Sequence, residues 1–235
     1  MSKKISMILC TYNEVNYIEE TIKLISKTLK NVEIIIVDDN SNDGTLEKLE
    51  VLKTTFNFKL IIRKDERGLA SAHKRGFDES TGEYVGTIDV NSKDQILYFN
   101  DLSNKLDEGN DIAVLSRYIH GGRDERIFIR SFSSRAINLV SKFFLRIPFN
   151  DFTSGIFLMK RKLLDYSNII KTGYAEWFIE FVFVAHKNKY KLIEIPYIQK
   201  MDEKLSVSKS YPNIFTFFYL GSIYFYRIIL TIIRN

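Results

Sequence analysis

Two kinds of apolar stretch alternate along the first half of the chain. Short runs that are apolar at nearly every position predict strands, and runs whose apolar residues recur every three or four positions predict helices. Strands are predicted at residues 5–10, 32–37, 58–63, 83–89 and 111–116, and helices at residues 16–30, 43–52, 69–79 and 95–107. This alternation predicts an α/β domain with a mostly parallel central sheet.

The second half of the chain is less regular. We predict a helix at residues 175–187 and a strand at Leu192–Ile195, which Pro196 ends. Residues 198–210 are polar and lack periodicity, so we interpret them as a mobile loop.

Residues 212–233 are rich in aromatic and aliphatic residues, and Arg227 is the only charged residue among them. As a helix this segment would be about 33 Å long, at ~1.5 Å per residue, which is enough to cross the hydrocarbon core of a bilayer. Packing as a terminal helix on the core is the alternative. We favour membrane association, because apolar residues occupy nearly all faces of such a helix. A span and a helix in the headgroup layer both stay open, and Arg227 is placed to reach the membrane surface.

The composition has 45% hydrophobic and 27% charged residues, which excludes a chain that is disordered throughout. Its net charge of +5 favours an anionic ligand or an anionic membrane surface and does not require nucleic acid. Residues 117–146 hold seven basic residues against only Asp124 and Glu125. This segment is either a positive patch for phosphate or a solvated basic helix face.

Cys10 is the sole cysteine, which excludes an intrachain disulfide and a cysteine-based zinc cluster. The apolar run at residues 5–10 is too short for the core of a signal peptide. We therefore expect the protein in the cytosol or on the cytoplasmic face of a membrane.

Polar residues follow three of the predicted strands, at Thr11–Glu14, Asp38–Asn40 and Asp89–Asn91. The carboxyl ends of parallel strands meet at one edge of a sheet, where ligands bind in such folds. Helix caps and turns would explain residues such as Ser41 and Asp43. Three converging clusters favour a binding site.

Further segments along the chain carry a resemblance to a known family. They are Thr-Tyr-Asn-Glu at 11–14, Val-Asp-Asp-Asn-Ser-Asn-Asp-Gly-Thr at 37–45, Gly-Leu-Ala-Ser-Ala at 68–72, Asp-Val-Asn at 89–91, Ser-Arg-Tyr at 116–118, Gly-Gly at 121–122, Arg130 with Ser134, Asp-Phe-Thr-Ser-Gly at 151–155, Glu180, and Ser-Lys at 208–209. In this order the chain resembles the polyprenyl-phosphate glycosyltransferases, the dolichol-phosphate mannosyltransferase-like branch of the family 2 enzymes.

The resemblance covers about residues 5–210 and implies a GT-A-like fold with helices on both faces of the sheet. It implies a glycosyltransferase domain at residues 1–210, whose nucleotide-binding half ends near residue 116 and whose acceptor half follows. Residues 211–235 would then form the apolar, membrane-associated helix.

The resemblance also implies an activity, the inverting transfer of a hexose from a nucleoside-diphosphate sugar to a polyprenyl phosphate at the membrane. The nucleotide-sugar-binding residues would be Thr11, Tyr12, Glu14, Asp38, Asp39, Gly68 and Lys209. The acceptor phosphate would be held by Arg117, Arg130 and Ser134. The chemistry is reasonable, because guanidinium groups bind phosphate oxygens through paired hydrogen bonds and a phosphate needs no strong general base.

The chain departs from this family at the metal site. The family has Asp-x-Asp followed by Gln, and this chain has Asp89, Asn91 and Lys93 at those positions. We expect Asp89 and Asn91 to bind Mg²⁺ or Mn²⁺ weakly or not at all, and Asp89 and Lys93 to be the catalytic pair, with Lys93 neutralising the diphosphate. In the alternatives, Lys93 points to solvent while Asp94 binds the metal, or the site is impaired.

Two other functions stay open beside polyprenyl-phosphate transfer. One is a family 2 transferase that acts on a sugar hydroxyl, which would require a carboxylate base near the acceptor. The other is a non-catalytic member that binds nucleotide or lipid, which Asn91 and Lys93 keep in consideration.

Overall fold

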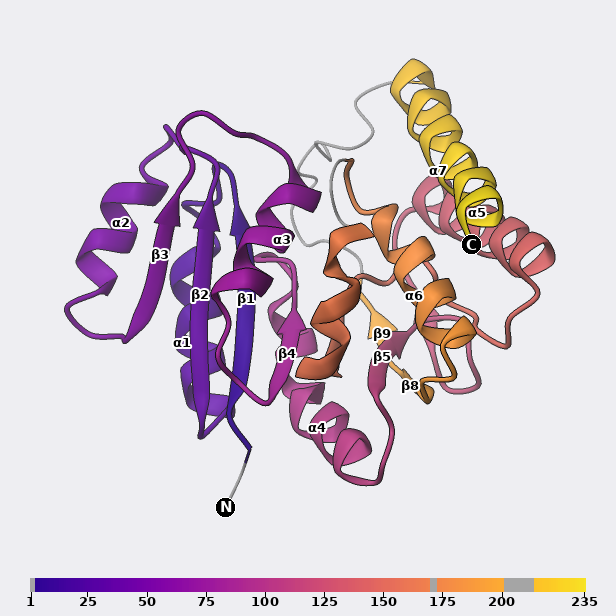
Figure 1. Ribbon diagram of the computed structural model, residues 1–235. Coiled ribbons are helices and arrows are strands. Elements are labelled where there is room, and N and C mark those ends of the chain that lie inside the picture. Colours follow the sequence, from indigo (N-terminus) through magenta and orange to yellow (C-terminus); the bar gives the residue numbers. More distant parts are fainter. Residues whose placement is uncertain (1–2, 170–172, 201–213) are drawn as a thin grey trace.

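The computed structural model describes residues 3–169, 173–200 and 214–235 (Figure 1). The strands are β1 (Ile5–Thr11), β2 (Val32–Asp38), β3 (Phe58–Ile62), β4 (Tyr84–Thr87), β5 (Ile112–Ser116), β6 (Arg123–Asp124), β7 (Phe157–Lys160), β8 (Leu192–Pro196) and β9 (Ile198–Gln199). The α-helices are α1 (Ile18–Thr28), α2 (Thr45–Leu52), α3 (Leu69–Glu79), α4 (Phe99–Asp107), α5 (Phe128–Leu145), α6 (Trp177–Lys187) and α7 (Ile214–Arg234), and the 3₁₀ helices are η1 (Lys93–Tyr98) and η2 (Arg161–Ile169).

Seven strands form one sheet in the order β3-β2-β1-β4-β7-β5-β8, and β6 and β9 form a second, two-stranded sheet. Within the large sheet β7 runs antiparallel to both of its neighbours, and the other neighbouring pairs are parallel. The predicted mostly parallel sheet is thus confirmed. The short β7 was not predicted, because four residues are too few for a periodic signal.

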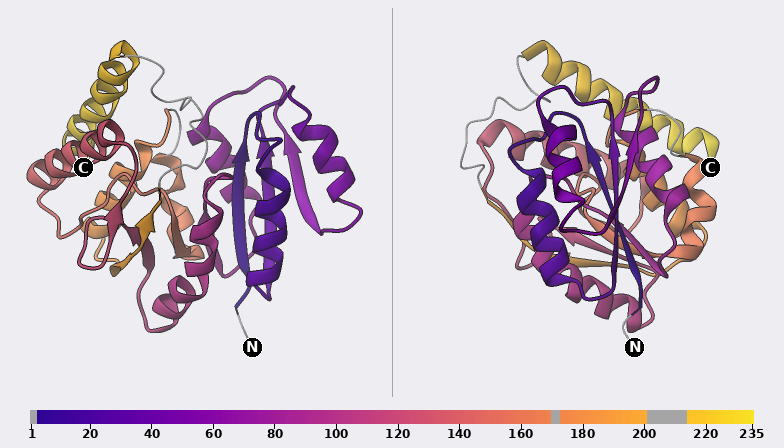
Figure 2. Two further views of the ribbon diagram at one scale, coloured as in Figure 1. Left: turned by 180° about the vertical axis from the view of Figure 1, so that it is seen from behind. Right: turned by 90° about the vertical axis from the view of Figure 1, so that its left-hand side faces the viewer.

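Alternate residues of β1 face two different cores, and helices lie on both sides of the sheet (Figure 2). Met7 and Leu9 pack with residues of α1, α2 and α4, whereas Ile8 packs with residues of α3 and α6. All three side chains are completely buried, and each such burial contributes about 1.5–3 kcal/mol. The two-sided burial explains the continuous apolar pattern of the strand and shows that helices cover both faces of the sheet.

Helix α3 lies unusually close to β1 at Gly76. A Cβ at this position would stand 2.5 Å from Cγ2 of Ile8, closer than real side chains approach. The glycine therefore lets α3 pack directly on the central strand. This contact fixes the position of α3 along β1. The first turn of α3 therefore lies beside the carboxyl ends of the strands (Figure 1).

The predicted helix at 175–187 and strand at 192–195 are confirmed as α6 and β8. The long helix α5 lies within the basic segment, for which a solvated helix face was one of two interpretations, but the bounds of this helix were not predicted. Its apolar residues include Phe128, Phe132 and Phe143, which are exposed. Their helical spacing therefore belongs to an outward-facing surface. The arginines between them interrupt the apolar pattern by which a helix that faces a core is recognised.

Helix α7 packs along one side against α5 and α6 (Figure 1). Ile228 and Thr231 are buried in this contact. Arg227 is also buried, and its guanidinium binds Glu180 and Glu176 at 3.0 and 3.3 Å. The expectation that Arg227 reaches the membrane surface is therefore wrong, and the packing alternative describes this side of α7.

Among the helices that the structure describes, none combines the length and the apolar character needed to span a bilayer. Of the segment interpreted as a loop, residues 198–199 form β9, and residues 201–210 lie outside the described part of the chain.

Candidate active site

Thr11 and Asp38 end β1 and β2 and interact inside the protein. The Thr11 hydroxyl donates to Oδ2 of Asp38 at 2.7 Å, and the backbone nitrogen and hydroxyl of Ser41 donate to the same carboxylate at 2.8 and 2.7 Å. Asp38 is 0% exposed. Both residues were predicted to bind the nucleotide directly, but here they support the loops, and Asp38 has no surface to offer to a ligand.

The loop after β1 is tied to the loop after β2 through the same residues. The backbone nitrogen of Asn13 donates to the Ser41 hydroxyl, and Asn13 Oδ1 accepts from the nitrogen of Asn42, both at 2.9 Å. Asn13 and Asn40 have φ angles near +58° and +57°, which asparagine tolerates better than most residues. The asparagines thus shape the sheet edge that carries Tyr12 and Asp39.

Asp39 is buried in a network with Arg63 and Gly68. Nε of Arg63 donates to Oδ1 of Asp39 at 2.7 Å, and the nitrogen of Gly68 donates to Oδ2 at 2.8 Å. Arg63 also donates to the Gly68 carbonyl at 2.9 Å. Gly68 has φ +140°, a backbone conformation that favours glycine. Asp39 and Gly68 were both predicted site residues, and the structure brings them together.

Arg63 was missed by sequence reasoning, which placed it at the end of an apolar strand. A charged residue directly after β3 lies at the same sheet edge as Asp38 and Asp39, and this position was a usable signal. A second arginine, Arg67, lies with its guanidinium 3.8 Å from the centre of the Tyr12 ring. Arg67 thus covers one side of the ring of Tyr12, which is a predicted nucleotide-sugar-binding residue.

Asp89 follows β4 at the same edge and is exposed to solvent. Neighbouring protein atoms nevertheless reduce its hydration, and this, together with the Glu14 charge, raises the pKa of Asp89. Lys93 binds Glu20 of α1 at 2.9 Å, and Asp94 binds Lys200 at 2.9 Å. Both ion pairs lie at the surface, and the Lys93 side chain is 45% exposed, as in the alternative in which Lys93 points to solvent. Metal binding by Asp94 stays a prediction.

The donor set tests whether a divalent metal fits here. Within residues 3–169, 173–200 and 214–235, no three His, Cys, Asp or Glu side chains form a group that could hold a metal ion. Asp89 supplies one carboxylate, and Mg²⁺ is commonly held by one or two carboxylates together with substrate phosphates. The residues therefore fit an ion that binds jointly with a diphosphate, and they do not fit one held by protein groups alone.

Arg117 follows β5 and forms a buried, bidentate ion pair with Asp151. Its Nε and Nη2 donate to the two carboxylate oxygens at 2.8 and 2.6 Å, and Nη2 also donates to Thr153 at 2.8 Å. Arg117 is 4% exposed. The residue predicted to bind the acceptor phosphate is thus held by a carboxylate in this structure, and Nη1 is directed toward Asp124 at 3.8 Å.

Asp124 connects Arg117 to helix α5. Arg126 donates to both Asp124 oxygens at 2.8 and 2.7 Å and to the hydroxyl of Ser134 at 2.9 Å. The Tyr118 hydroxyl donates to the same carboxylate at 2.8 Å. Predicted residues Arg117 and Ser134 thus belong to one network, which we call the arginine cluster (Arg117, Arg126, Asp124, Ser134).

Arg130 lies in the first turn of α5, one turn before Ser134. Lys209, predicted to bind the nucleotide sugar, lies outside the described residues. Sequence reasoning assigned no role to Arg126 or Asp124. The basic character of residues 117–146 pointed to the right segment, but pairings within it depend on the fold.

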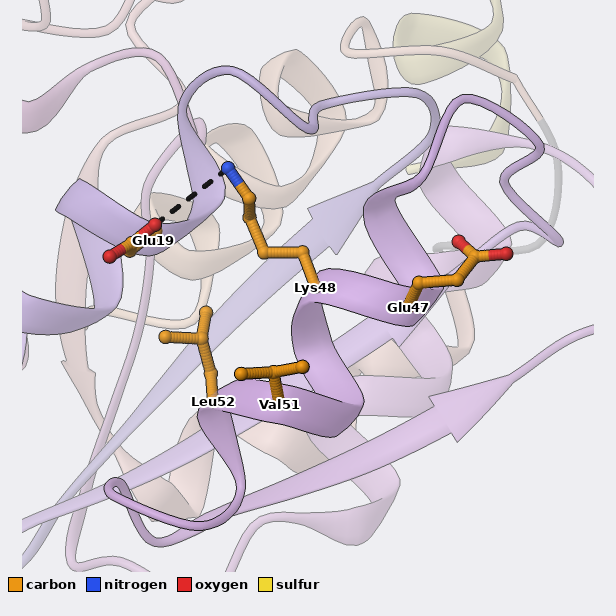
Figure 3. Close-up of a pocket in the computed structure, with 5 residues that line it drawn as sticks. All are labelled: Glu19, Glu47, Lys48, Val51 and Leu52. Carbon is orange, nitrogen blue, oxygen red and sulfur yellow. Dashed lines mark ion pairs between the residues drawn. The ribbon is translucent and has the colours of Figure 1, made fainter.

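A hollow of about 300 Å³ lies between α1 and α2, away from these groups (Figure 3). Its lining residues are Glu19, Glu47, Lys48, Val51 and Leu52. None of them is a predicted site residue. The candidate site is therefore defined by the strand ends and by the arginine cluster.

Comparisons with known proteins identify relatives of this chain. Over 202 residues the chain is 33% identical to a dolichol-phosphate mannosyltransferase from Pyrococcus furiosus, and the match covers 83% of this chain and 56% of that protein. It is 28% identical over 212 residues to a polyprenol monophosphomannose synthase from Mycolicibacterium smegmatis, covering 86% and 79% of the two chains. The chain thus spans little more than half the length of the first relative.

Among solved structures, glucosyl-3-phosphoglycerate synthase from Mycobacterium tuberculosis, in complex with Mn²⁺, uridine diphosphate and glucosyl-3-phosphoglycerate, superposes with a TM-score of 0.69 at 16% identity. The match covers 97% of this chain and 80% of that one and shows the GT-A-like α/β fold. The model of the family described as glycosyl transferase family 2 matches residues 6–167. The chain belongs to glycosyl transferase family 2.

Proposed function

We propose that the protein transfers a hexose from a nucleoside-diphosphate sugar to a polyprenyl phosphate at a membrane surface. The observation that carries the proposal is the position of the arginine cluster, at the beginning of a helix whose outer side is apolar. A polyprenyl phosphate has a charged phosphate followed by a long hydrocarbon chain, which matches a charged cluster followed by an apolar helix surface.

The charge of the cluster supports an anionic acceptor. Arg117 and Arg126 of the cluster, with Arg130 one turn before Ser134 in α5, carry three positive charges, and Asp124 and Asp151 carry two negative charges. Arginine binds phosphate oxygens through forked hydrogen bonds. An arriving phosphate would compete with Asp151 or Asp124 for these donors and would find them already oriented.

The surface beside the cluster supports a lipid environment. Exposed apolar residues of α5 and α7 form what we call the apolar face, comprising Phe128, Phe132, Leu139, Phe143 and Phe144 of α5 and Phe225, Tyr226, Ile229, Ile232 and Ile233 of α7. Phe144 and Phe225 contact each other, with ring centres 6.3 Å apart, so the face continues across the two helices. Large exposed apolar patches are typical of membrane or protein contacts.

Charge favours the membrane over a protein partner at this face. The sequences of α5 and α7 contain no Asp or Glu, and the charges on α5 are Arg130, Arg135 and Lys142. Basic residues beside an apolar helix surface are attracted to anionic lipid headgroups. The cytoplasmic side of that membrane stays a prediction.

The sheet edge at β1, β2 and β4 would hold the donor. Asp39 is preorganised by Arg63 and Gly68 to accept hydrogen bonds from a base or ribose, and the exposed Asp89 lies at the neighbouring strand end. The names of the two relatives indicate mannose as the first sugar to test.

The reaction would be an in-line displacement. An acceptor phosphate oxygen forms a bond to the anomeric carbon, while the bond from that carbon to the diphosphate oxygen breaks, which inverts the anomeric centre. The nucleoside diphosphate leaves with the bonding electron pair, and no proton needs to be removed from the attacking oxygen. Lys93 and a metal ion that binds with the donor near Asp89 would supply positive charge for the leaving group.

A sugar hydroxyl is a less suitable acceptor, because it would need a general base. Burial alone would raise the pKa of Asp124, but the hydrogen bonds and charge of Arg126, followed by the charge of Arg117, outweigh it and lower that pKa to about 2. Such a carboxylate is a weak proton acceptor at neutral pH.

Donor binding without turnover is the second candidate function, favoured by the binding of Lys93 to Glu20.

One screen separates these functions. The full chain is mixed with GDP-mannose, UDP-glucose or other sugar nucleotides, with a short polyprenyl phosphate, with a free sugar or with no acceptor, in magnesium, manganese or EDTA. Nucleoside diphosphate release that depends on the polyprenyl phosphate supports the proposal. Release that instead depends on an added sugar supports hydroxyl transfer, and nucleotide binding without release under all conditions supports the non-catalytic function.

A further inference from the structure

Arg227 is a buried charge within an otherwise apolar helix. Its guanidinium lies between two carboxylates of α6, with Glu180 at 3.0 Å and Glu176 at 3.3 Å. All three residues are buried, at 8%, 1% and 2% exposure. An apolar side chain would pack α7 onto α6 at a smaller desolvation cost, and buried ion pairs are better attested as setting the register of two elements than as stabilising them.

Glu176 also holds the segment that precedes α6. Its Oε2 accepts a hydrogen bond from the backbone nitrogen of Tyr174 at 2.8 Å. Gly173 lies so close that a Cβ there would fall 1.9 Å from Oε1 of Glu176 and 3.2 Å from Nη2 of Arg227. The backbone at Gly173, with φ +112°, is thus placed directly against the ion pair.

Gly173 in turn touches the nucleotide half of the molecule. Its carbonyl oxygen accepts a hydrogen bond from the backbone nitrogen of Ala70 at 3.3 Å. Ala70 belongs to the first turn of α3, where backbone N–H groups lack partners within the helix. Two residues earlier, Gly68 donates to Asp39 at 2.8 Å.

The side chains of α3 and α6 pack together beside this hydrogen bond. The ring of Trp177, at the beginning of α6, lies 5.5 Å from that of His73 and 6.1 Å from that of Phe77. The contact is aromatic and buried. Movement of the beginning of α6 would therefore be transmitted to α3.

We propose that Arg227 is a positioning residue for the donor end of the site, acting through Glu176 and Gly173 on the first turn of α3. The proposal rests on the proposed function in assigning Asp39 and Gly68 to nucleotide binding. Because α7 also contributes to the apolar face, lipid contact on one side of α7 and nucleotide binding beyond α3 would favour the same arrangement of these elements.

The test uses the full chain and three variants. Arg227→Met removes the charge and keeps an apolar side chain, Glu176→Gln keeps the pair between Arg227 and Glu180, and Arg234→Met changes an exposed arginine of the same helix as the control. Hydrogen exchange is followed at the Ala70 amide and in α7. Calorimetry gives the affinity for GDP and UDP.

We expect exchange at Ala70 to rise about tenfold in Arg227→Met and in Glu176→Gln, and to stay unchanged in Arg234→Met. The affinity for the bound nucleotide should fall by about two- to 30-fold in the first two variants only. If Arg227→Met does not fold, Glu176→Gln alone decides the matter, because it leaves the main anchor of α7 in place.

Unchanged exchange at Ala70 in a folded Glu176→Gln protein would overturn the link, whatever happens in α7. The exchange result tests the link from Arg227 and Glu176 to α3 even if the unmodified protein binds neither nucleotide. A lack of nucleotide binding would count against the proposed function and not against this link. Faster exchange at Ala70 without any loss of nucleotide affinity would overturn the positioning role.

Discussion

Glu194 of β8 accepts the backbone hydrogen bond of Asp151 at 3.0 Å, and Asp151 is the carboxylate that holds Arg117. The other Glu194 oxygen accepts two hydrogen bonds from Asn150, at 3.0 and 2.7 Å. Burial raises the pKa of Glu194, and the hydrogen bonds from Ser116 and Asn150 only partly offset it. One strand thus sets the position of the residue that we assign to the acceptor phosphate.

Glu194→Gln should weaken acceptor binding without affecting the donor. A glutamine amide would direct N–H groups toward backbone N–H donors, so the turn at Asp151 would shift and Arg117 with it. We expect the KM for polyprenyl phosphate to rise by about tenfold, the effect of a hydrogen bond worth ~1–2 kcal/mol. Glu108→Gln, at an exposed ion pair, is the control. Equal changes in donor and acceptor KM would contradict this assignment.

Arg117→Ala should affect stability as well as acceptor binding. Removing one partner of a buried ion pair leaves the other charge uncompensated, which costs about 3–5 kcal/mol. Arg123→Ala, at an arginine whose side chain is 70% exposed, should cost about 0.5 kcal/mol or less. Urea unfolding gives both values. A change of the same size in both variants would show that the bond to Asp151 contributes little.

Arg126→Ala offers a cleaner test of the arginine cluster. Asp124 keeps its hydrogen bond from Tyr118 and the nearby charge of Arg117, so the fold should persist. Loss of a charged contact to the acceptor phosphate, at ~1.5–3 kcal/mol, should raise the acceptor KM tens-fold. Donor affinity should be unchanged. Unaltered acceptor kinetics would remove Arg126 from the phosphate site.

Without donor, the protein should bind manganese weakly or not detectably, because Asp89 is the one carboxylate among Asp89, Asn91 and Lys93. The double change Asn91→Asp with Lys93→Gln should strengthen manganese binding in calorimetry, since it adds a carboxylate and removes a positive charge. It should also make turnover more dependent on metal. Tight manganese binding by the unmodified protein without donor would refute the charge argument.

His73 should make the fold sensitive to acid. Burial, followed by the Arg63 charge, lowers the pKa of His73 to about 4, from an unfolded value of 6.5. Between these values the unfolded chain binds a proton that the folded protein does not, so stability falls as pH falls from 6.5 to 4. The loss should reach about 3 kcal/mol. His73→Gln, measured by urea unfolding across this range, should lose correspondingly less than the unmodified protein.

Membrane binding should depend on the apolar face. Leu139→Glu with Phe143→Glu places two charges on the exposed side of α5 and should reduce binding to vesicles that contain anionic lipid. Val51→Glu, at an exposed residue of α2, is the matched control. A truncation at residue 211 is a poorer test, because it also removes Arg227, the cation that pairs with Glu176 and Glu180. Unchanged vesicle binding in the double variant would contradict membrane docking through α5.

The nucleotide half could be predicted well because its periodicity reflects burial. Ile8 and its neighbours in β1 are buried on both faces, and the strand reads as a continuous apolar run. In α5 the same logic fails, since Leu139 and Phe143 are apolar but exposed. A pattern records the spacing of apolar residues and does not record whether they face a core or the outside.

The residue types of the site were also predictable, but their partners were not. Asp39 and Arg117 were identified from their positions after strands. Arg63 and Asp151, which bind them, lie 24 and 34 residues away along the chain. Only the folded sheet brings such residues within hydrogen-bond distance. A residue that binds the ligand therefore cannot be told apart, in the sequence, from a residue that holds it in place.

The antiparallel strand β7 acts as a spacer in the middle of the sheet. Because it lies between β4 and β5, those two strands run in the same direction and end at the same edge, two strand widths apart. At ~4.8 Å per strand, that separation is about 10 Å. Asp89 follows one strand and Arg117 the other. If the diphosphate leaves from beside Asp89 and the phosphate arrives beside Arg117, as we propose, a single reversed strand sets the distance across which a glycosyl group would move.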